Sequence, residues 1–282
     1  MKKDILRKVK DHKKYRSISD SVVEKEIEEV LRVDSKMGDK ELVKEVRKIL
    51  HRLYSSYQTG KKGKRDKYLE RLKILVSDKN KDGEEFDALV SEMLSITLST
   101  KERLEDYDEI YSKIFSITGK PKRIVDLGCG MNPLSFPLMG LSKLEYFGYD
   151  IDIDDIRFLN EYFKVMAGSG LKGKAEVLDV RDLIKIGKIP KCDVVFMFKL
   201  VDLIDSGKNK VSEELIAGLL GKAKWVVVSF ATRTLTRKSM RLGERRGFEK
   251  MLERVGLKWE RFSTGNEVFY VVGGELITGR KV

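Results

Sequence analysis

Cysteine is scarce in this chain of 282 residues, and no apolar run is long enough to span a bilayer. The two cysteines, Cys129 and Cys192, lie far apart in apolar contexts, which predicts neither a disulfide framework nor a zinc site. The first residues form a basic amphipathic pattern instead of a signal peptide. We therefore expect a cytoplasmic protein of a reducing compartment, with no metal site and no membrane association.

Negative charge is scarce at both ends of the chain. The net charge is +10 over residues 1–80, −6 over residues 81–221 and +8 over residues 222–282. This asymmetry predicts that the positive charge faces a polyanion. A solubilising surface is the simpler explanation, and the charged content of 36% also fits the ion-paired surface of a thermophile.

Helical patterns fill the first part of the chain. Apolar residues recur at helical spacing over residues 22–31 and 40–57, and further helices continue to about residue 117. Gly119-Lys120-Pro121 then ends the pattern, because glycine and proline together terminate a helix. We expect an all-helical domain over residues 1–118 and a second domain over residues 119–282.

Strands and helices alternate from Lys122 onward, which is typical of an α/β domain with a parallel sheet. The turn at residues 264–266 should join the last two strands as an antiparallel pair. The seven expected strands cover residues 123–127, 145–150, 174–178, 192–198, 224–230, 257–263 and 267–272.

A glycine turn follows the first expected strand, which ends in Asp126 and breaks into Gly128-Cys129-Gly130. Such a turn at the carboxyl edge of an α/β sheet is where nucleotide-like ligands bind, because glycine lets the backbone approach closely. Asp150 ends the second strand and can accept hydrogen bonds from two ribose hydroxyls, while Asp179 can reach an adenine amino group. Met131-Asn132-Pro133 replaces the third glycine of a dinucleotide motif, which disfavours a nicotinamide or flavin enzyme.

Over residues 122–282 this order and spacing resemble the class I S-adenosylmethionine-dependent methyltransferases, which have a Rossmann-like fold. Within this class, the chain resembles the aminoglycoside-resistance 16S rRNA guanine-N7 methyltransferases, and this resemblance extends over nearly the whole chain. A housekeeping relative of that family from a thermophile or an archaeon is a second possibility. The segments that carry the resemblance are Lys13-Lys14-Tyr15, Ser99-Thr100-Lys101-Glu102-Arg103-Leu104, residues 126–134, residues 198–203 and Gly265-Asn266-Glu267.

The resemblance implies S-adenosylmethionine as the cofactor and a role for Arg103 in binding its carboxylate, a task that suits a planar bidentate donor. Phe198 ends the fourth strand and could pack against the sulfonium or stack on the target base. Lys199 should point into the active-site mouth. These two residues are the predicted catalytic residues. The predicted cofactor contacts are Arg103, Asp126, Gly128, Gly130, Asn132, Asp150, Ile151, Asp179, Val180, Phe198 and Leu200.

The resemblance also implies 16S rRNA as the partner. We expect the N-terminal domain to dock on folded rRNA through its basic helices and the loop at residues 60–67, and the loop after the fifth strand to contact phosphates and the target base. An assembled 30S particle is the expected substrate, and the protein is expected to be a monomer. The predicted RNA-binding residues are Lys13, Lys14, Lys61, Lys62, Lys64, Arg65, Arg233, Arg237, Lys238, Arg241 and Asn266.

The target atom follows from the resemblance and agrees with the residues. The N7 lone pair of guanine lies in the ring plane and needs no deprotonation, which fits the absence of an evident general base. Neither cysteine lies where a cytosine-C5 enzyme needs its nucleophile, and Phe198-Lys199-Leu200 is not a motif for exocyclic amino groups. The open alternatives are N4 of a neighbouring cytidine, a non-catalytic RNA-binding protein of ribosome assembly, and a methyltransferase for small molecules or proteins.

Overall fold

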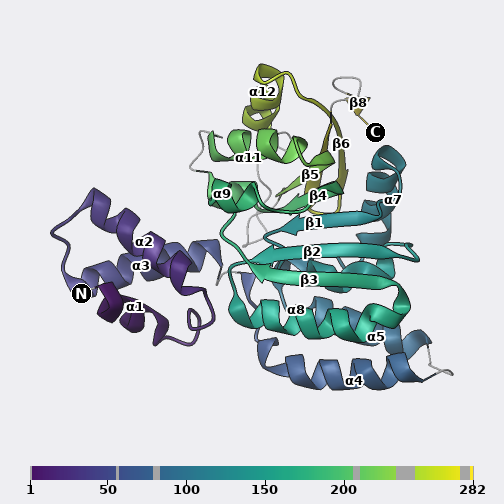
Figure 1. The fold of residues 1–282 in the computed structure, drawn as a ribbon, viewed down its shortest axis with the longest axis horizontal. Helices are drawn as coiled ribbons and strands as arrows, with labels where there is room; N and C mark the ends of the chain where they lie inside the picture. The colour runs from purple at the N-terminus through teal and green to yellow at the C-terminus, as the bar shows by residue number, and fades with distance from the viewer. Residues whose placement is uncertain are drawn as a thin grey trace.

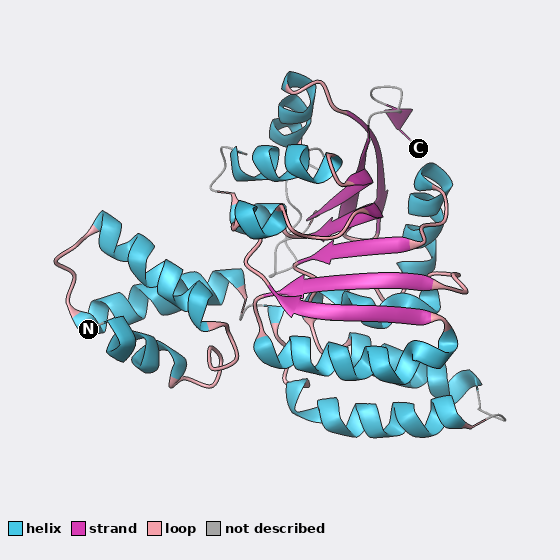
Figure 2. Cartoon of the chain, in the orientation of Figure 1, coloured by secondary structure: helices cyan, strands magenta, loops and turns pink. Residues whose placement is uncertain are grey.

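The computed structural model describes residues 2–54, 57–78, 83–205, 210–232, 245–273 and 280–281. A twisted sheet with helices on both faces forms the larger part of the molecule, and a small helical unit lies beside it (Figure 1). Figure 2 shows the same division by secondary structure, with strands confined to the larger part. This arrangement confirms the predicted α/β fold with a helical N-terminal region.

The sheet has the order β3-β2-β1-β4-β5-β7-β6-β8. All pairs from β3 to β5 are parallel, and β7 is antiparallel to both β5 and β6 as predicted. The strands are β1 (Arg123–Leu127), β2 (Leu144–Asp150), β3 (Leu171–Val177), β4 (Cys192–Phe198), β5 (Ala223–Ala231), β6 (Lys258–Thr264), β7 (Glu267–Gly273) and the two-residue β8 (Arg280–Lys281).

The third strand begins three residues earlier than its predicted start at residue 174. Its first residues pair with β2, from Leu171 opposite Leu144 onward. β3 is an edge strand whose polar residues face solvent, so its sequence lacks the apolar run that marks the central strands. The central strands β1 and β4 are buried almost throughout, and their hydrophobic patterns predict their bounds correctly.

Helices from different parts of the chain cover the two faces of the sheet (Figure 1). One apolar cluster joins the sheet to α4 (Arg65–Ser77), α5 (Gly83–Leu94), α7 (Tyr107–Thr118) and α8 (Ile153–Met166). The cluster on the other face includes residues of α9 (Leu183–Ile186), α10 (Val201–Ile204), α11 (Lys210–Leu220) and α12 (Arg246–Arg254). The short elements are η2 (Lys62–Lys64), α6 (Leu98–Lys101), η3 (Asn132–Leu138) and η4 (Ala167–Ser169).

Three N-terminal helices form a unit with its own apolar core: α1 (Lys2–Lys10), α2 (Asp20–Val33) and α3 (Asp39–Leu53). The hydrophobic clusters therefore divide the chain near residue 54 and not at the predicted boundary near residue 118. Gly119 has φ +73 and ends α7, which packs on the sheet, so the glycine–proline signal marks a helix end inside the larger core. α3 also ends at Leu53, four residues before its predicted end.

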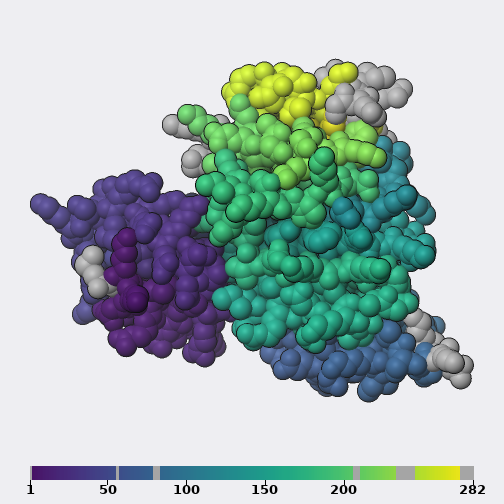
Figure 3. Space-filling view, viewed as in Figure 1, coloured from purple at the N-terminus to yellow at the C-terminus, as the bar shows by residue number. Residues whose placement is uncertain are grey.

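The N-terminal unit is attached at the edge of the sheet where the parallel strands end, and in the space-filling view it protrudes as a separate lobe (Figures 1 and 3). Ser19 N–H donates to the Ile151 carbonyl at 2.9 Å, and Ile153 N–H donates to the Ser17 carbonyl at 2.8 Å. These bonds tie the start of α2 to the segment between β2 and α8. Among the described residues, no helix combines the length and the apolar character that crossing a membrane requires.

Candidate cofactor pocket and active site

The turn after β1 is shaped by two glycines with positive φ, Gly128 at +66° and Gly130 at +47°. A Cβ at Gly128 would lie 2.9 Å from a methyl carbon of Leu200, whereas a Cβ at Gly130 would meet no atom within 4 Å. The first glycine therefore permits close packing against the end of β4. The second opens onto a cavity and needs glycine for its backbone conformation.

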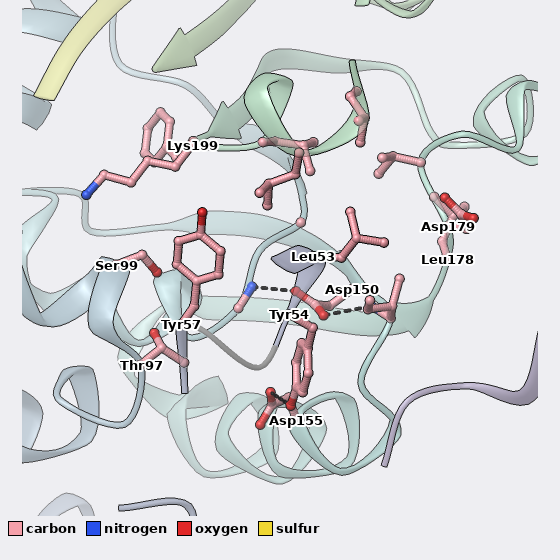
Figure 4. Close-up of a pocket in the computed structure, with 18 of the residues that line it drawn as sticks. Leu53, Tyr54, Tyr57, Thr97, Ser99, Asp150, Asp155, Leu178, Asp179 and Lys199 are labelled. Carbon is pink, nitrogen blue, oxygen red and sulfur yellow. Dashed lines mark hydrogen bonds between the residues drawn. The ribbon is translucent and has the colours of Figure 1, made fainter. Parts of the chain in front are cut away.

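Asp150 ends β2 directly beside this turn. Its Oδ2 accepts a hydrogen bond from Gly130 N–H at 2.8 Å, and its Oδ1 accepts from Ile151 N–H at 2.7 Å (Figure 4). Burial raises the pKa of Asp150, and the Gly130 hydrogen bond counteracts part of that effect. The carboxylate is thus held in one orientation at the cavity, as a group that must accept two ribose hydroxyls requires.

A single cavity brings together nine of the predicted site residues. It opens at the carboxyl edge of the sheet, next to the end of α3. In Figure 4, Tyr57, Ser99 and Lys199 lie on one side of the cavity, and Leu178 and Asp179 lie on the other. The predicted residues that line it are Gly128, Gly130, Asp150, Ile151, Asp179, Val180, Phe198, Lys199 and Leu200.

The cavity lining fits an adenosine-type cofactor without a pyrophosphate. Leu178, Val180 and Leu200 contribute apolar lining, and the Asp150 carboxylate lines the same cavity. An apolar wall suits a nucleobase ring, and a fixed carboxylate suits a ribose. These residues could hold S-adenosylmethionine, which would supply the methyl group.

Asp179 is engaged more strongly than its sequence position indicates. Its two carboxylate oxygens accept hydrogen bonds from Arg181 Nε and Nη2 at 2.9 and 2.8 Å, and Lys25 of α2 lies 3.4 Å away. Although burial opposes it, the Arg181 guanidinium keeps the pKa of Asp179 below its usual value. The Asp179 carboxylate is already held by Arg181. Its predicted contact with an adenine amino group stays a prediction.

Asp126 and Asn132 do not line the cavity, contrary to their prediction as cofactor contacts. Both are buried behind the glycine turn, where Asp126 Oδ2 accepts from Asn132 Nδ2 at 2.9 Å and from the Tyr146 hydroxyl at 2.5 Å. Burial raises the pKa of Asp126 to about 7. The backbone of Asn132 also supports the turn, because its N–H donates to the Cys129 carbonyl at 2.9 Å.

Arg103 also lies outside the cavity lining, and its carboxylate partner in this structure belongs to the protein. Its Nε and Nη2 each lie 2.9 Å from an oxygen of Glu267, and both side chains are almost completely buried. The Arg103 Cζ is 5.0 Å from the centre of the Phe198 ring. Arg103 is thus held by Glu267 and lies against the ring of Phe198. Its predicted role in binding the cofactor carboxylate stays a prediction.

Lys199 has a backbone conformation that is unusual for a residue with a side chain, with φ +54. Its Nζ donates to Glu102 Oε2 at 2.8 Å and lies 3.2 Å from Glu267 Oε2. Only 7% of its side chain is exposed, and Lys199 lines the cavity with its ammonium group held by Glu102 and Glu267. Its predicted role in the active-site mouth stays a prediction. Phe198 beside it lines the cavity and stacks on Phe196 with ring centres 4.6 Å apart.

Two of the predicted RNA-binding residues form ion pairs inside the protein instead. Lys62 Nζ lies 3.0 Å from Asp152 and 3.3 Å from Asp155, and Arg65 pairs with the buried Asp155. Burial lowers the pKa of Lys62. These contacts tie η2 and the start of α4 to the start of α8, which the basic loop alone does not reveal.

The other predicted RNA-binding residues have different placements. Lys13, Lys14 and Lys64 are exposed, and Lys61 and Asn266 are partly exposed. The Asn266 carbonyl accepts from Thr232 N–H at 2.7 Å, which places it beside the loop that follows β5. The loop positions Arg233, Arg237, Lys238 and Arg241 lie outside the described residues.

Residues from the N-terminal unit complete the cavity, and sequence patterns miss them. Leu53 and Tyr54 end α3, and Tyr57 follows shortly after. The Tyr54 hydroxyl donates to the buried Asp152, which fixes this end of α3 against α8. Ser99, Leu178 and Leu203 stand in or beside quoted motifs and could have been found there. No local signal marks Tyr54, because its partner lies 98 positions later.

The chain matches a family model described as ribosomal RNA methyltransferase (FmrO) over residues 11–271. It is 30% identical over 262 residues to a 16S rRNA (guanine(1405)-N(7))-methyltransferase of Proteus mirabilis, covering 86% of this chain and 89% of that protein. A protein of the same name from Frankia casuarinae is 28% identical over 265 residues, with 92% and 89% covered.

Among solved structures, the fold is similar to the 16S rRNA methyltransferase RmtF in complex with S-adenosyl-L-homocysteine. The TM-score is 0.77 at 25% identity, with 96% of this chain and 97% of that chain covered. The 16S rRNA methylase RmtB gives a TM-score of 0.70 at 22% identity and covers 98% of this chain and 99% of its own. The likeness extends over both the helical unit and the sheet.

Proposed function

The chain belongs to the ribosomal RNA methyltransferase (FmrO) family, and on that premise we propose that it transfers a methyl group from S-adenosylmethionine to N7 of a guanine in 16S rRNA. The observation that supports this most directly is the cavity at the carboxyl edge of the sheet. There the Asp150 carboxylate, fixed by Gly130, and the ring of Phe198 line one pocket. The curated relatives named for guanine N7 support the choice of atom.

The proposed chemistry asks for positioning and the exclusion of water. Guanine N7 offers a lone pair in the ring plane, so the enzyme needs to align that lone pair with the methyl group and needs no base. Phe198 is the aromatic surface of the cavity at the end of β4. A flat, nearly buried ring at this position can stack on an extruded base and keep water from the sulfonium.

The substrate is proposed to be 16S rRNA within the assembled small subunit, approached by a monomer in the cytoplasm. The exposed Lys13, Lys14 and Lys64, with the partly exposed Lys61 and Asn266, are the described candidates for rRNA contacts. Lysine contacts to phosphates position a protein without reading sequence. Recognition of a folded particle, in which the rRNA backbone has one fixed shape, suits such a surface.

Incubating the protein with 30S subunits and S-adenosylmethionine tests the proposal. The methylated rRNA is then digested and its nucleosides are identified by mass spectrometry. We expect 7-methylguanosine as the new product, at a rate that exceeds the rate with protein-free 16S rRNA. N4-methylcytidine alone would transfer the reaction to the neighbouring nucleotide, and no methylated product together with no cofactor binding would favour a non-catalytic RNA-binding protein.

A further inference from the structure

Glu267 is a buried carboxylate outside the cofactor cavity that contacts two residues with predicted functions. It is the first residue of β7, only 1% exposed, and lies opposite Ala231 of β5 and Thr264 of β6. It receives hydrogen bonds from Arg103 and Ser229, and Lys199 is the third group beside it. An acid buried between two strands in this way is rare unless it is fully paired.

The pairing with Arg103 fixes the plane of the guanidinium group. Nε and Nη2 donate to the two oxygens of Glu267, both at 2.9 Å, in the bidentate geometry that restricts rotation most. The guanidinium carries five N–H groups, of which this contact occupies two. The Tyr107 hydroxyl is a further neighbour of Arg103, and the face of Phe198 lies 5.0 Å from Cζ.

The pairing with Lys199 holds a strained residue at the end of β4. Lys199 N–H donates to the Ser229 carbonyl at 3.1 Å and to Ser229 Oγ at 3.0 Å, and Ser229 Oγ in turn donates to Glu267. A positive φ at a residue with a side chain persists only where the surroundings enforce it. Glu267 and Ser229 provide that enforcement from β7 and β5.

The charges around Glu267 balance only while it is ionised. Although burial opposes ionisation, Arg103 and Lys199 keep the pKa of Glu267 below its usual value. A neutral group there would leave two nearly buried cations side by side, with Glu102 as the remaining carboxylate near Lys199. Such an arrangement is costly, so the carboxylate and both cations hold one another in place.

We propose that Glu267 is a positioning residue for methyl transfer: it orients Arg103 toward the cofactor carboxylate and fixes Lys199 next to Phe198. This inference rests on the proposed function of the pocket. It assigns β7 a part in the reaction, although β7 contributes no residue to the cavity lining. Because Glu267 acts through Arg103 and Lys199, its loss should affect cofactor binding more than rRNA binding.

The first test replaces Glu267 by glutamine, which keeps the shape and removes the charge. We expect the KM for S-adenosylmethionine to rise about tenfold, the equivalent of one charge-assisted hydrogen bond, with the KM for 30S subunits unchanged. Glu267→Asp, which keeps the charge, should recover part of this loss. A purely structural role would lower the amount of active enzyme and hence kcat, without a selective change in KM.

Glu249→Gln is the matched control, because Glu249 also accepts from an arginine and a tyrosine, Arg261 at 3.1 Å and Tyr270 at 2.8 Å, but does not line the cavity. The control should leave the KM for S-adenosylmethionine as it is. An equal or tighter affinity for S-adenosylhomocysteine in Glu267→Gln would overturn the proposal, since it would mean that Glu267 competes with the cofactor for Arg103.

A second variant leaves all charges intact in case Glu267→Gln fails to fold. Gly265 has φ +51, and a Cβ there would overlap the Asp106 carboxylate in the turn after Arg103. Gly265→Ala should therefore push the β6–β7 hairpin away from that turn and weaken cofactor binding in the same way. Gly256→Ala is its control, because Gly256 has φ +72 and a Cβ there would meet no atom within 4 Å.

The outcomes separate this inference from the proposed function. Unmodified protein that methylates 30S subunits, together with a Gly265→Ala variant whose KM for S-adenosylmethionine matches that of Gly256→Ala, would overturn the role of Glu267 alone. Unmodified protein that binds no S-adenosylmethionine in calorimetry would overturn the function of the pocket itself.

Discussion

The carboxyl group of Asp126 lies in a place where its charge is costly. It is 1% exposed and is held by Asn132 and the Tyr146 hydroxyl. Burial raises its pKa from 3.8 to about 7 in the folded protein. Because the pKa of Asp126 is higher in the folded than in the unfolded protein, its protonated form stabilises the fold. This contribution to the free energy of unfolding is complete below pH 4 and is lost as the pH rises through 7.

We therefore expect Asp126→Asn to flatten the pH dependence of stability. Between pH 5 and 7 the unmodified protein should lose up to about 1.4 kcal/mol of unfolding free energy per pH unit relative to the variant. Urea unfolding followed by circular dichroism at several pH values measures this difference. Parallel stability curves for the two proteins across that range would contradict the assignment.

Gly130 offers a second test at the scale of one residue. Alanine there should weaken S-adenosylhomocysteine binding at least tenfold, because its Cβ would enter the cavity. Gly140 is a matched control, since it has φ +60 and a Cβ there would also meet no atom within 4 Å, but it does not line the cavity. Both variants should lose about 1 kcal/mol of stability from backbone strain. Calorimetry that finds equal affinities in both would show that Gly130 does not face the cofactor.

At this scale the sequence predicts residues that act close to their neighbours in the chain. Gly128, Gly130 and Asp150 stand at strand ends, so their meeting at one edge follows from the parallel topology. Glu267 and Arg103 meet across 164 positions, and no periodicity reports which of many carboxylates an arginine will find. Asp126 is next to the glycines in sequence, but its side chain bonds to Asn132 and Tyr146 on the buried side of the turn. The sequence does not show which way this side chain faces.

The loop and helix elements between α3 and α4 show how a charge pattern can mislead. The basic run at residues 60–67 is typical of a phosphate-binding loop, yet Lys62 and Arg65 pair with Asp152 and Asp155 at the start of α8. Asp152 caps α8 by accepting from Asp155 N–H at 2.7 Å. These acids lie beside the cofactor cavity, so the elements that bind one another here also shape the pocket.

Asp155→Asn should weaken the packing of η2 and α4 on α8. We expect a loss of about 2 kcal/mol in unfolding free energy, because two cations would lose a buried partner while retaining some contact with solvent. Asp154→Asn is the control, since Asp154 pairs with Arg157 on the exposed side of the same helix. Its effect should stay within about 0.5 kcal/mol. Similar losses in both variants would show that the ion pairs of Asp155 do not hold η2 and α4 on α8.

The sequence predicts the order of the helices and strands well, but it does not predict which helices pack into which hydrophobic core. Alternating apolar strands and helices indicate the sheet and its antiparallel end correctly from residue 122 onward. Amphipathic helices of one kind fill residues 2–118, and their patterns do not tell which core each one faces. Only the packing assigns α4, α5 and α7 to the sheet and leaves α1–α3 as a unit of their own.

Across the whole molecule, charge of opposite sign meets at the carboxyl edge of the sheet. Asp152, Asp155 and Asp179 lie there and contact Lys62, Arg65 and Lys25 of the preceding segments. Part of the net charge of +10 over residues 1–80 is thus used within the protein. Of the predicted RNA-binding lysines in that region, Lys13, Lys14 and Lys64 are exposed and Lys61 is partly exposed, so these four are the candidates to face rRNA.

Reversing these four lysines to glutamate tests the interface. Binding to 30S subunits should weaken at least tenfold at moderate salt and become less salt-dependent, because each lost phosphate contact removes counterion release. The affinity for S-adenosylhomocysteine should stay the same, since none of the four lines the cavity. Fluorescence titration at several salt concentrations measures both the affinity and its salt slope.

The control variant carries the same charge change at the opposite edge of the sheet. Lys122, Lys143, Lys172 and Lys191 are exposed around a groove at the amino ends of the strands, away from the N-terminal unit (Figure 1). If rRNA binds at the face that carries Lys13, Lys14, Lys61 and Lys64, this variant should keep most of its affinity and methylate 30S subunits at the unmodified rate. Equal losses in both variants would mean that net charge alone drives binding, and the docking role of these four lysines would be lost.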